Sequence, residues 1–161
     1  MMPDVLVVLT FVTALGCGLS AGALFSFSSF VMKALARLQP AQGIAAMQSI
    51  NVVAVTPVFM TALFGTAVAS VVVAVWALAD WDDSYGPYLL AGSGLYLAGT
   101  IGLTMGYHVP RNNALARIEP TNPDAEAHWR RYVADWTRWN HVRVAAALAA
   151  AATLTEALRV D

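Results

Sequence analysis

The residues best suited to chemistry lie in one short stretch, residues 136–143, which reads WTRWNHVR. An imidazole side chain can act as a general base, so His141 is a candidate for that role. Asn140 and Arg143 are hydrogen-bond donors that can hold a developing oxyanion. Trp136 and Trp139 offer flat faces on which an aromatic substrate can stack. We therefore predict a site with His141, Asn140 and Arg143 as catalytic residues and with both tryptophans as substrate-binding residues.

Part of this stretch shares one face if it is helical. A rotation of about 100° per residue gives a single stripe that contains Trp129, Tyr132, Trp136, Asn140 and Arg143. His141 lies beside that stripe. Tryptophan, tyrosine and arginine are also common anchors at membrane interfaces, which is the alternative explanation for each of them alone. Their coincidence favours a site.

A second polar group consists of His108, Asn112 and Asn113. Antiparallel helices joined by a short connection would bring it to the first group and form a pocket at the inner face of the membrane. Asn112 and Asn113 are then predicted to bind and orient the substrate. His108 and His141 could instead hold a haem or a metal ion, but one cysteine and no further ligand pair accompany them. We therefore predict neither a metal site nor a cofactor.

The composition indicates which elements must position these residues. Of the 161 residues, 58% are hydrophobic and only 12% are charged. No Asp, Glu, Lys or Arg occurs in residues 5–32, 38–79 or 84–110, and about 20 apolar residues cross a bilayer. We predict an all-α integral membrane four-helix bundle, formed by residues 1–161 as a single domain. The expected spans are residues 5–32, 57–79, 87–108 and 139–158.

The last helix should be longer than its span. Asn122 is a good N-cap and Pro123 suits the first helical position, and no glycine or proline follows Pro123. The pattern predicts one helix whose first half extends into the cytoplasm. In the third span, Pro110 is expected to end or kink the helix.

Small residues predict close helix packing. Gly18 and Gly22 form a GxxxG pair in the first span, and Gly92 and Gly99 lie in the third. We favour packing inside one bundle for the GxxxG pair, with a homo-oligomer as the alternative.

Four spans place both termini on one side of the membrane. Eight of the nine basic residues lie in or beside the connections on the other side, and they are Lys33, Arg37, Arg111, Arg117, Arg130, Arg131, Arg138 and Arg143. The positive-inside rule then predicts a multi-pass protein of the inner (plasma) membrane with extracytoplasmic termini and cytoplasmic basic loops. The net charge is −1, and no basic stripe interleaved with aromatics indicates a nucleic-acid partner.

Three segments resemble a family of small membrane proteins that includes the fungal anthrone oxygenases. They are residues 22–30 (GALFSFSSF), residues 109–115 (VPRNNAL) and the pattern WxxWNxxR at residues 136–143. The resemblance extends over nearly the whole chain. His108 stands where the family more often has asparagine, and Arg111 stands where it more often has an apolar residue.

The resemblance implies a four-helix membrane bundle and, by analogy, oxidation of an anthrone-like or other electron-rich aromatic substrate by oxygen without a cofactor. His141 would then be the base, while Arg143 and Asn140 would hold the oxyanion. The alternative function is a non-catalytic membrane module that binds a small lipophilic ligand, haem or a partner protein. Similar folds carry different functions, so the site itself must decide.

Overall fold

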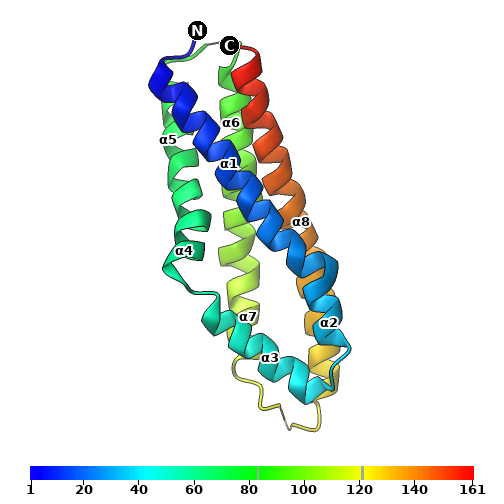
Figure 1. Ribbon diagram of the computed structural model, residues 1–161. Coiled ribbons are helices and arrows are strands. Elements are labelled where there is room, and N and C mark those ends of the chain that lie inside the picture. The colour runs from blue at the N-terminus through cyan, green and yellow to red at the C-terminus, as the bar shows by residue number, and fades with distance from the viewer. Residues whose placement is uncertain (83, 121) are drawn as a thin grey trace.

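The computed structural model describes every residue except Asp83 and Thr121. Four of its helices are long and apolar enough to cross a membrane, namely Asp4–Ala36, Pro57–Ala79, Gly86–Leu115 and Ala125–Arg159. They form an elongated bundle with both termini at one end (Figure 1). The predicted all-α four-helix membrane bundle is confirmed.

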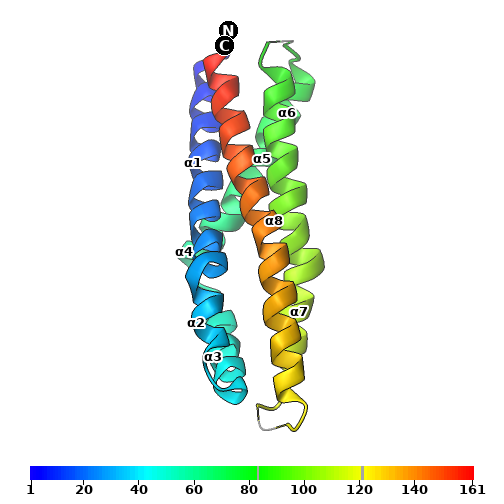
Figure 2. The same ribbon diagram turned by 90° about the vertical axis from the view of Figure 1, so that its right-hand side faces the viewer.

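Three of these helices contain π-helical turns, in which the hydrogen bonds skip one residue more than in an α-helix. The first helix comprises α1 (Asp4–Ser26), η1 (Phe27–Val31) and α2 (Met32–Ala36). The second comprises α4 (Pro57–Met60), η2 (Thr61–Gly65) and α5 (Thr66–Ala79). The third comprises α6 (Gly86–Gly94), η3 (Leu95–Gly102), η4 (Thr104–His108) and α7 (Val109–Leu115). The last, α8 (Ala125–Arg159), is α-helical throughout, and it runs beside α1 in both views (Figures 1 and 2).

The third helix does not end at Pro110, which was one of the two outcomes expected from the sequence. The proline lies inside α7, immediately after the π-helical turn η4. Proline cannot donate a backbone hydrogen bond and its ring crowds the preceding turn. A wider π-turn just before it accommodates both effects, so the helix continues to Leu115.

The long last helix is confirmed, although it begins slightly later than the capping pattern suggested. It begins at Ala125, and the Oδ1 of Asn122 accepts a hydrogen bond of 2.9 Å from the backbone N–H of Asp124. Asn122 thus forms a turn before the helix instead of capping it directly.

A shorter helix, α3 (Pro40–Val53), crosses the end of the bundle opposite the termini (Figure 1). The Nε2 of Gln48 ties it to the end of the third helix by donating to the carbonyls of Leu115 (2.9 Å) and Ile118 (3.0 Å). A short break follows, and Thr56 caps the next helix by accepting a 3.2 Å hydrogen bond from the N–H of Phe59. The chain therefore changes direction between α3 and α4.

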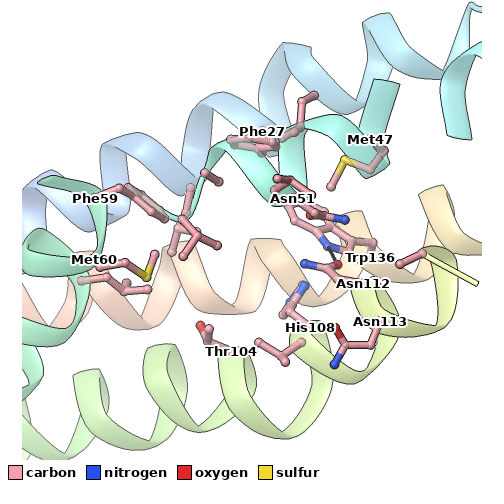
Figure 3. A pocket seen from close by; sticks show the side chains of 18 of the residues that line it. Phe27, Met47, Asn51, Phe59, Met60, Thr104, His108, Asn112, Asn113 and Trp136 are labelled. Carbon is pink, nitrogen blue, oxygen red and sulfur yellow. Dashed lines mark hydrogen bonds between the residues drawn. The ribbon is translucent and has the colours of Figure 1, made fainter. Parts of the chain in front are cut away.

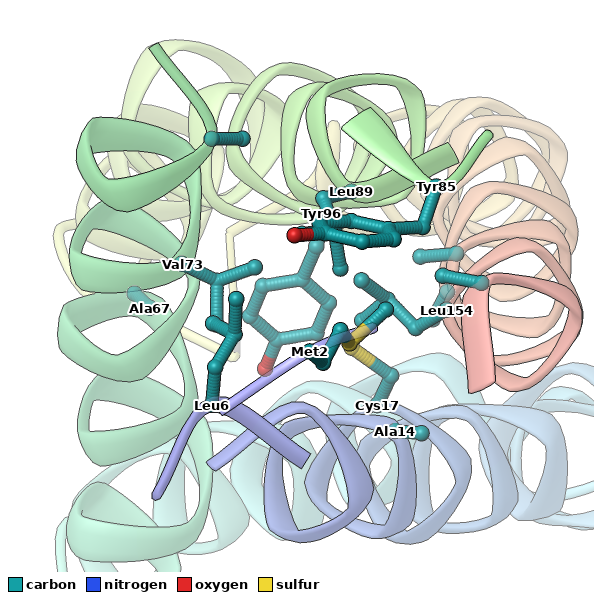
Figure 4. Packing of buried hydrophobic residues seen from close by; sticks show 14 of the residues in the cluster. Met2, Leu6, Ala14, Cys17, Ala67, Val73, Tyr85, Leu89, Tyr96 and Leu154 are labelled. Carbon is teal, nitrogen blue, oxygen red and sulfur yellow. The ribbon is translucent and has the colours of Figure 1, made fainter. Parts of the chain in front are cut away.

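The interior contains two apolar clusters. The cluster near the termini is built around Tyr96, whose side chain is fully buried among α1, α5, α6 and α8 (Figure 4). The Tyr96 hydroxyl donates to the carbonyl of Leu63 (3.0 Å) and shares a hydrogen bond of 2.8 Å with the hydroxyl of Ser20. The second cluster lies at the other end and includes Met47, Trp129 and Trp136. Polar residues lie between the two.

Glycines allow close contact at some of the predicted positions and not at others. A Cβ on Gly92 would lie 2.7 Å from the Cγ of Leu154, and one on Gly99 would collide with Ala146. By contrast, a Cβ on Gly18 or Gly22 would have nothing within 4 Å. Packing of the GxxxG pair inside one bundle is therefore wrong, because α1 meets α8 and α5 through other faces.

The outer surface of the bundle is apolar. On α1 alone, the exposed side chains include Val8, Phe11, Leu15 and Leu19. Such continuous apolar surface is stable only in hydrocarbon or under a partner. Together with the four long helices, it identifies a multi-pass membrane protein that contacts the lipid bilayer.

Candidate functional site

A cavity of about 370 Å³ lies where the α3–α4 break faces the third helix. Figure 3 shows Phe27, Asn51 and Phe59 on one side of it and Thr104, His108 and Asn112 on the other. Most of the lining is apolar, which is usual for a site that binds a small organic molecule. The few polar groups in this wall therefore determine what the cavity can do.

Arg143 contributes the positive charge in the cavity wall, although its side chain is only 5% exposed. Its Nη1 donates to the Oγ1 of Thr104 at 3.1 Å, and its Nη2 donates to the Oδ1 of Asn140 at 2.5 Å. The guanidinium carbon lies 5.3 Å from the ring centre of Trp136, within range of a cation–π interaction. These contacts hold the guanidinium in one orientation.

No carboxylate in the described part of the chain forms an ion pair with Arg143. Its Nε is also buried without a hydrogen-bond partner among those residues. A buried cation without a counter-ion is costly, in a membrane as in a protein core. The arrangement is therefore suited to a ligand that carries, or develops, negative charge on an oxygen atom.

Asn140 fixes the position of Arg143 from within the bundle. Its fully buried Nδ2 donates to the carbonyl of Leu24 (2.7 Å) and to the hydroxyl of Ser28 (2.6 Å), while its Oδ1 accepts from Arg143. Ser28 lies in the π-helical turn η1, and such turns are frequent at functional sites. Both N–H donors of the Asn140 amide are therefore used inside the protein.

A second polar group surrounds Asn112. Its Oδ1 accepts hydrogen bonds from the hydroxyl of Tyr132 (2.8 Å) and from the indole Nε1 of Trp136 (3.1 Å). Both donors come from α8, so Asn112 links that helix to α7. Nearby, the buried Nδ2 of Asn51 has no hydrogen-bond partner of suitable geometry in the described part of the chain. Asn51 lies in α3 and was not among the residues predicted for the site, because a single amide carries no pattern of spacing.

His108 lines the same cavity and is only 1% exposed. Its ring meets that of Trp136 edge to face, with the centroids 4.9 Å apart. Neither ring nitrogen makes a hydrogen bond of suitable geometry to another described residue. Thr104, which binds Arg143, precedes His108 by one helical turn, so both side chains lie on one face of the third helix.

The structure brings together most of the residues predicted for the site. Those that line the cavity are Asn112, Asn113, Trp136 and Arg143, with Asn140 directly behind Arg143. Trp139 is 37% exposed and packs on Tyr107, with the ring centroids 5.0 Å apart. His141 is exposed and does not line the cavity. The face of the last helix that carries Trp136 and Arg143 thus borders the cavity. Trp139 and His141 point away from that face and lie outside the cavity wall.

This arrangement also separates the two histidines that could have formed a haem or metal site. His108 is inside the cavity and His141 is on the outer surface. Among the residues that the structure describes, no group of three or more His, Cys, Asp or Glu side chains could hold a metal ion.

The sequence matches the model of one protein family, described as anthrone oxygenase, over residues 56–153. That range contains the cavity-lining parts of α4, η4, α7 and α8, and it leaves out residues 22–30, one of the three segments that resemble the family. No curated protein and no solved structure matches the chain. Since the match covers more than half of the chain, this protein belongs to the anthrone oxygenase family.

Proposed function

We propose that this protein is a membrane-embedded, cofactor-independent oxygenase that acts on an anthrone-like or other electron-rich aromatic substrate. The observation that supports it most is the buried guanidinium of Arg143, which faces an apolar cavity and forms no ion pair with a carboxylate of the described residues. The family of the chain supports the same chemistry.

The reaction needs little from the protein. An anthrone has an acidic CH₂ group between two aromatic rings, and removal of a proton leaves an enolate that reacts directly with O₂. The carbon gains one oxygen atom as a new carbonyl, and the other oxygen atom leaves as water with both hydrogens of the CH₂ group. The protein must supply a base, a cation for the enolate oxygen and a cavity that excludes water.

The site residues divide these tasks. Arg143 holds the enolate oxygen, and Asn140 acts as a positioning residue because both N–H donors of its amide are bonded to protein atoms. Trp136 and Phe27, whose ring centroids are 5.7 Å apart, offer aromatic surface to the substrate rings. Asn112 and Asn113 orient polar substituents at the other end of the cavity.

The border of the cavity favours a lipophilic substrate. Val52, Val55 and Val109 line it and are 75%, 68% and 37% exposed. In a bilayer these side chains face lipid, so a molecule dissolved in the membrane reaches the cavity without crossing water. We also infer that the basic end of the bundle is cytoplasmic and that both termini are extracytoplasmic.

Oxygen uptake with anthrone, measured above the uncatalysed rate on protein in detergent or nanodiscs, tests the proposal. Arg143→Met should lower kcat/KM by about 10²- to 10³-fold, the usual effect of removing an oxyanion donor. Arg143→Lys keeps the charge but loses the forked geometry, so we expect an intermediate rate. Arg138→Met, an exposed arginine of the same helix, is the matched control and should keep the wild-type rate.

Two results would contradict the proposal: no oxygen uptake by the wild-type protein, or full activity in a folded Arg143→Met variant. The unpaired donors in the cavity also suit a non-catalytic module that binds a lipophilic anion. A co-purified ligand found by mass spectrometry, together with no turnover of aromatic ketones, would favour this second function.

A further inference from the structure

We propose that His108 is the base that removes the substrate proton, in place of His141. This inference rests on the proposed oxygenase function. It assigns the removal of the substrate proton, which neither Arg143 nor the aromatic side chains can perform.

The hydrogen bonding of His108 is the first observation. Its side chain is 1% exposed, it lines the cavity, and both of its ring nitrogens lack a partner of suitable geometry among the described residues. A buried polar group without a partner is costly and usually has a functional reason. A neutral imidazole has one nitrogen free to accept a proton. A bound substrate would supply the missing partner.

The placement of His108 relative to Arg143 is the second observation. Thr104 accepts a hydrogen bond of 3.1 Å from Arg143 and lies one turn before His108 on the same helix. In an anthrone, the ketone oxygen and the acidic carbon lie on opposite sides of the central ring. A substrate whose oxygen faces Arg143 can therefore present its C–H group to His108, within the same cavity.

Two aromatic contacts orient the imidazole. Trp136 meets it edge to face at 4.9 Å, and Tyr107 packs on it at 5.4 Å, with both distances between ring centroids. Figure 3 shows the ring directed toward Trp136 and Asn112, with Thr104 one turn away. His141 has the required chemistry but not the position, since its side chain is exposed and lies outside the cavity wall.

The proposed steps balance. The C–H bond breaks, its proton moves to a nitrogen of His108, and the electron pair delocalises onto the ketone oxygen beside Arg143. The enolate carbon then bonds to O₂, and the protonated His108 returns its proton to the terminal peroxide oxygen. This transfer restores the neutral imidazole. The hydroperoxide then loses water as its O–O bond and the remaining C–H bond break, which leaves the new carbonyl of the quinone.

Proton removal can be measured without oxidation. Anthrone is incubated with the protein in D₂O without oxygen, and deuterium entry into its CH₂ group is followed by NMR or mass spectrometry. The wild-type protein should accelerate exchange above the buffer rate, and His108→Gln should reduce this acceleration by about 10²-fold or more. His128→Gln, an exposed histidine at the start of α8, is the matched control and should exchange as the wild type does.

A structural role for His108 gives a different result. Imidazole added to His108→Ala should restore part of the exchange if the lost group is a base, and should have no effect if the variant is only misfolded. Quenching of tryptophan fluorescence by anthraquinone checks that the cavity is intact. Wild-type exchange in a His108→Gln variant that binds anthraquinone would overturn this proposal and leave the oxygenase function standing. Absence of both exchange and oxygen uptake in the wild-type protein would overturn both proposals.

Discussion

Asn140 determines what its neighbour Arg143 can do. Its side chain is completely buried, and its three hydrogen bonds go to Leu24 of α1, to Ser28 of η1 and to the guanidinium of Arg143. An amide whose two N–H donors are used in this way has no donor left for a substrate oxyanion. Asn140 is therefore expected to act on the reaction through Arg143, whereas the sequence suggested direct contact with the oxyanion.

Asn140→Leu is expected to lower kcat far more than it raises KM, because it frees the guanidinium without narrowing the cavity. It also leaves the Ser28 hydroxyl without this donor, at a cost of about 1–3 kcal/mol, whereas the Leu24 carbonyl still accepts from the N–H of Phe27. Steady-state oxygen uptake and thermal melting in detergent measure the two effects.

Thr137→Val is the matched control for that variant. The Oγ1 of Thr137 is buried on the same helix and has no hydrogen-bond partner among the described residues, so its loss should change neither melting nor kcat. Equal losses of activity in the two variants would show that any polar loss on α8 damages the protein and that Asn140 has no special link to Arg143.

Only some of the site residues predicted on the last helix line the cavity, because a helical wheel gives limited information. A helical wheel gives the angle between side chains, so Trp136, Asn140 and Arg143 were correctly grouped, and all three are buried. It does not show which other helices surround that face. One residue of rotation, about 100°, separates the buried Asn140 from the exposed His141.

At the scale of helices, three of the four membrane segments followed directly from the long uncharged runs, and the fourth followed from the stretch without glycine or proline after Pro123. Their ends were harder to predict. The third helix continues past Pro110 because the π-helical turn η4 precedes the proline, and hydropathy carries no signal for such a turn. The break between α3 and α4, which borders the cavity, was likewise not predicted. It depends on how α3 packs against the end of the third helix.

The contact between α6 and α8 gives a prediction at this scale. Gly92→Leu should destabilise the protein by about 1–3 kcal/mol or more, since even a Cβ would lie 2.7 Å from the Cγ of Leu154. Gly18→Leu adds the same side chain where nothing lies within 4 Å, so it should leave the melting temperature of the monomer unchanged. Thermal melting and size-exclusion chromatography of both variants check this.

The same pair of variants tests the homo-oligomer. If two copies pack through Gly18 and Gly22, Gly18→Leu will shift the elution toward the monomer. If Gly92→Leu melts at the wild-type temperature, the close packing of α6 on α8 is contradicted.

At the scale of the whole molecule, the basic residues are concentrated at the end opposite the termini. Arg37, Arg117 and Arg130 are exposed there, while the terminal end carries acidic residues such as Asp4 and Asp80. The cavity lies between the two apolar clusters, toward the basic end. The orientation of the bundle thus decides which side of the membrane is nearer to the site.

Cysteine labelling gives a direct test of the orientation, because Cys17 is the only cysteine and is buried. Ser84→Cys places an exposed thiol at the terminal end, and Glu119→Cys places one at the basic end. By the positive-inside rule, a membrane-impermeant maleimide added to intact cells should label Ser84→Cys and spare Glu119→Cys. Both should react after the membrane is opened with detergent, and the wild-type protein should remain unlabelled in intact cells. The opposite labelling pattern would place the termini in the cytoplasm, and the mouth of the cavity would then lie nearer to the outer leaflet.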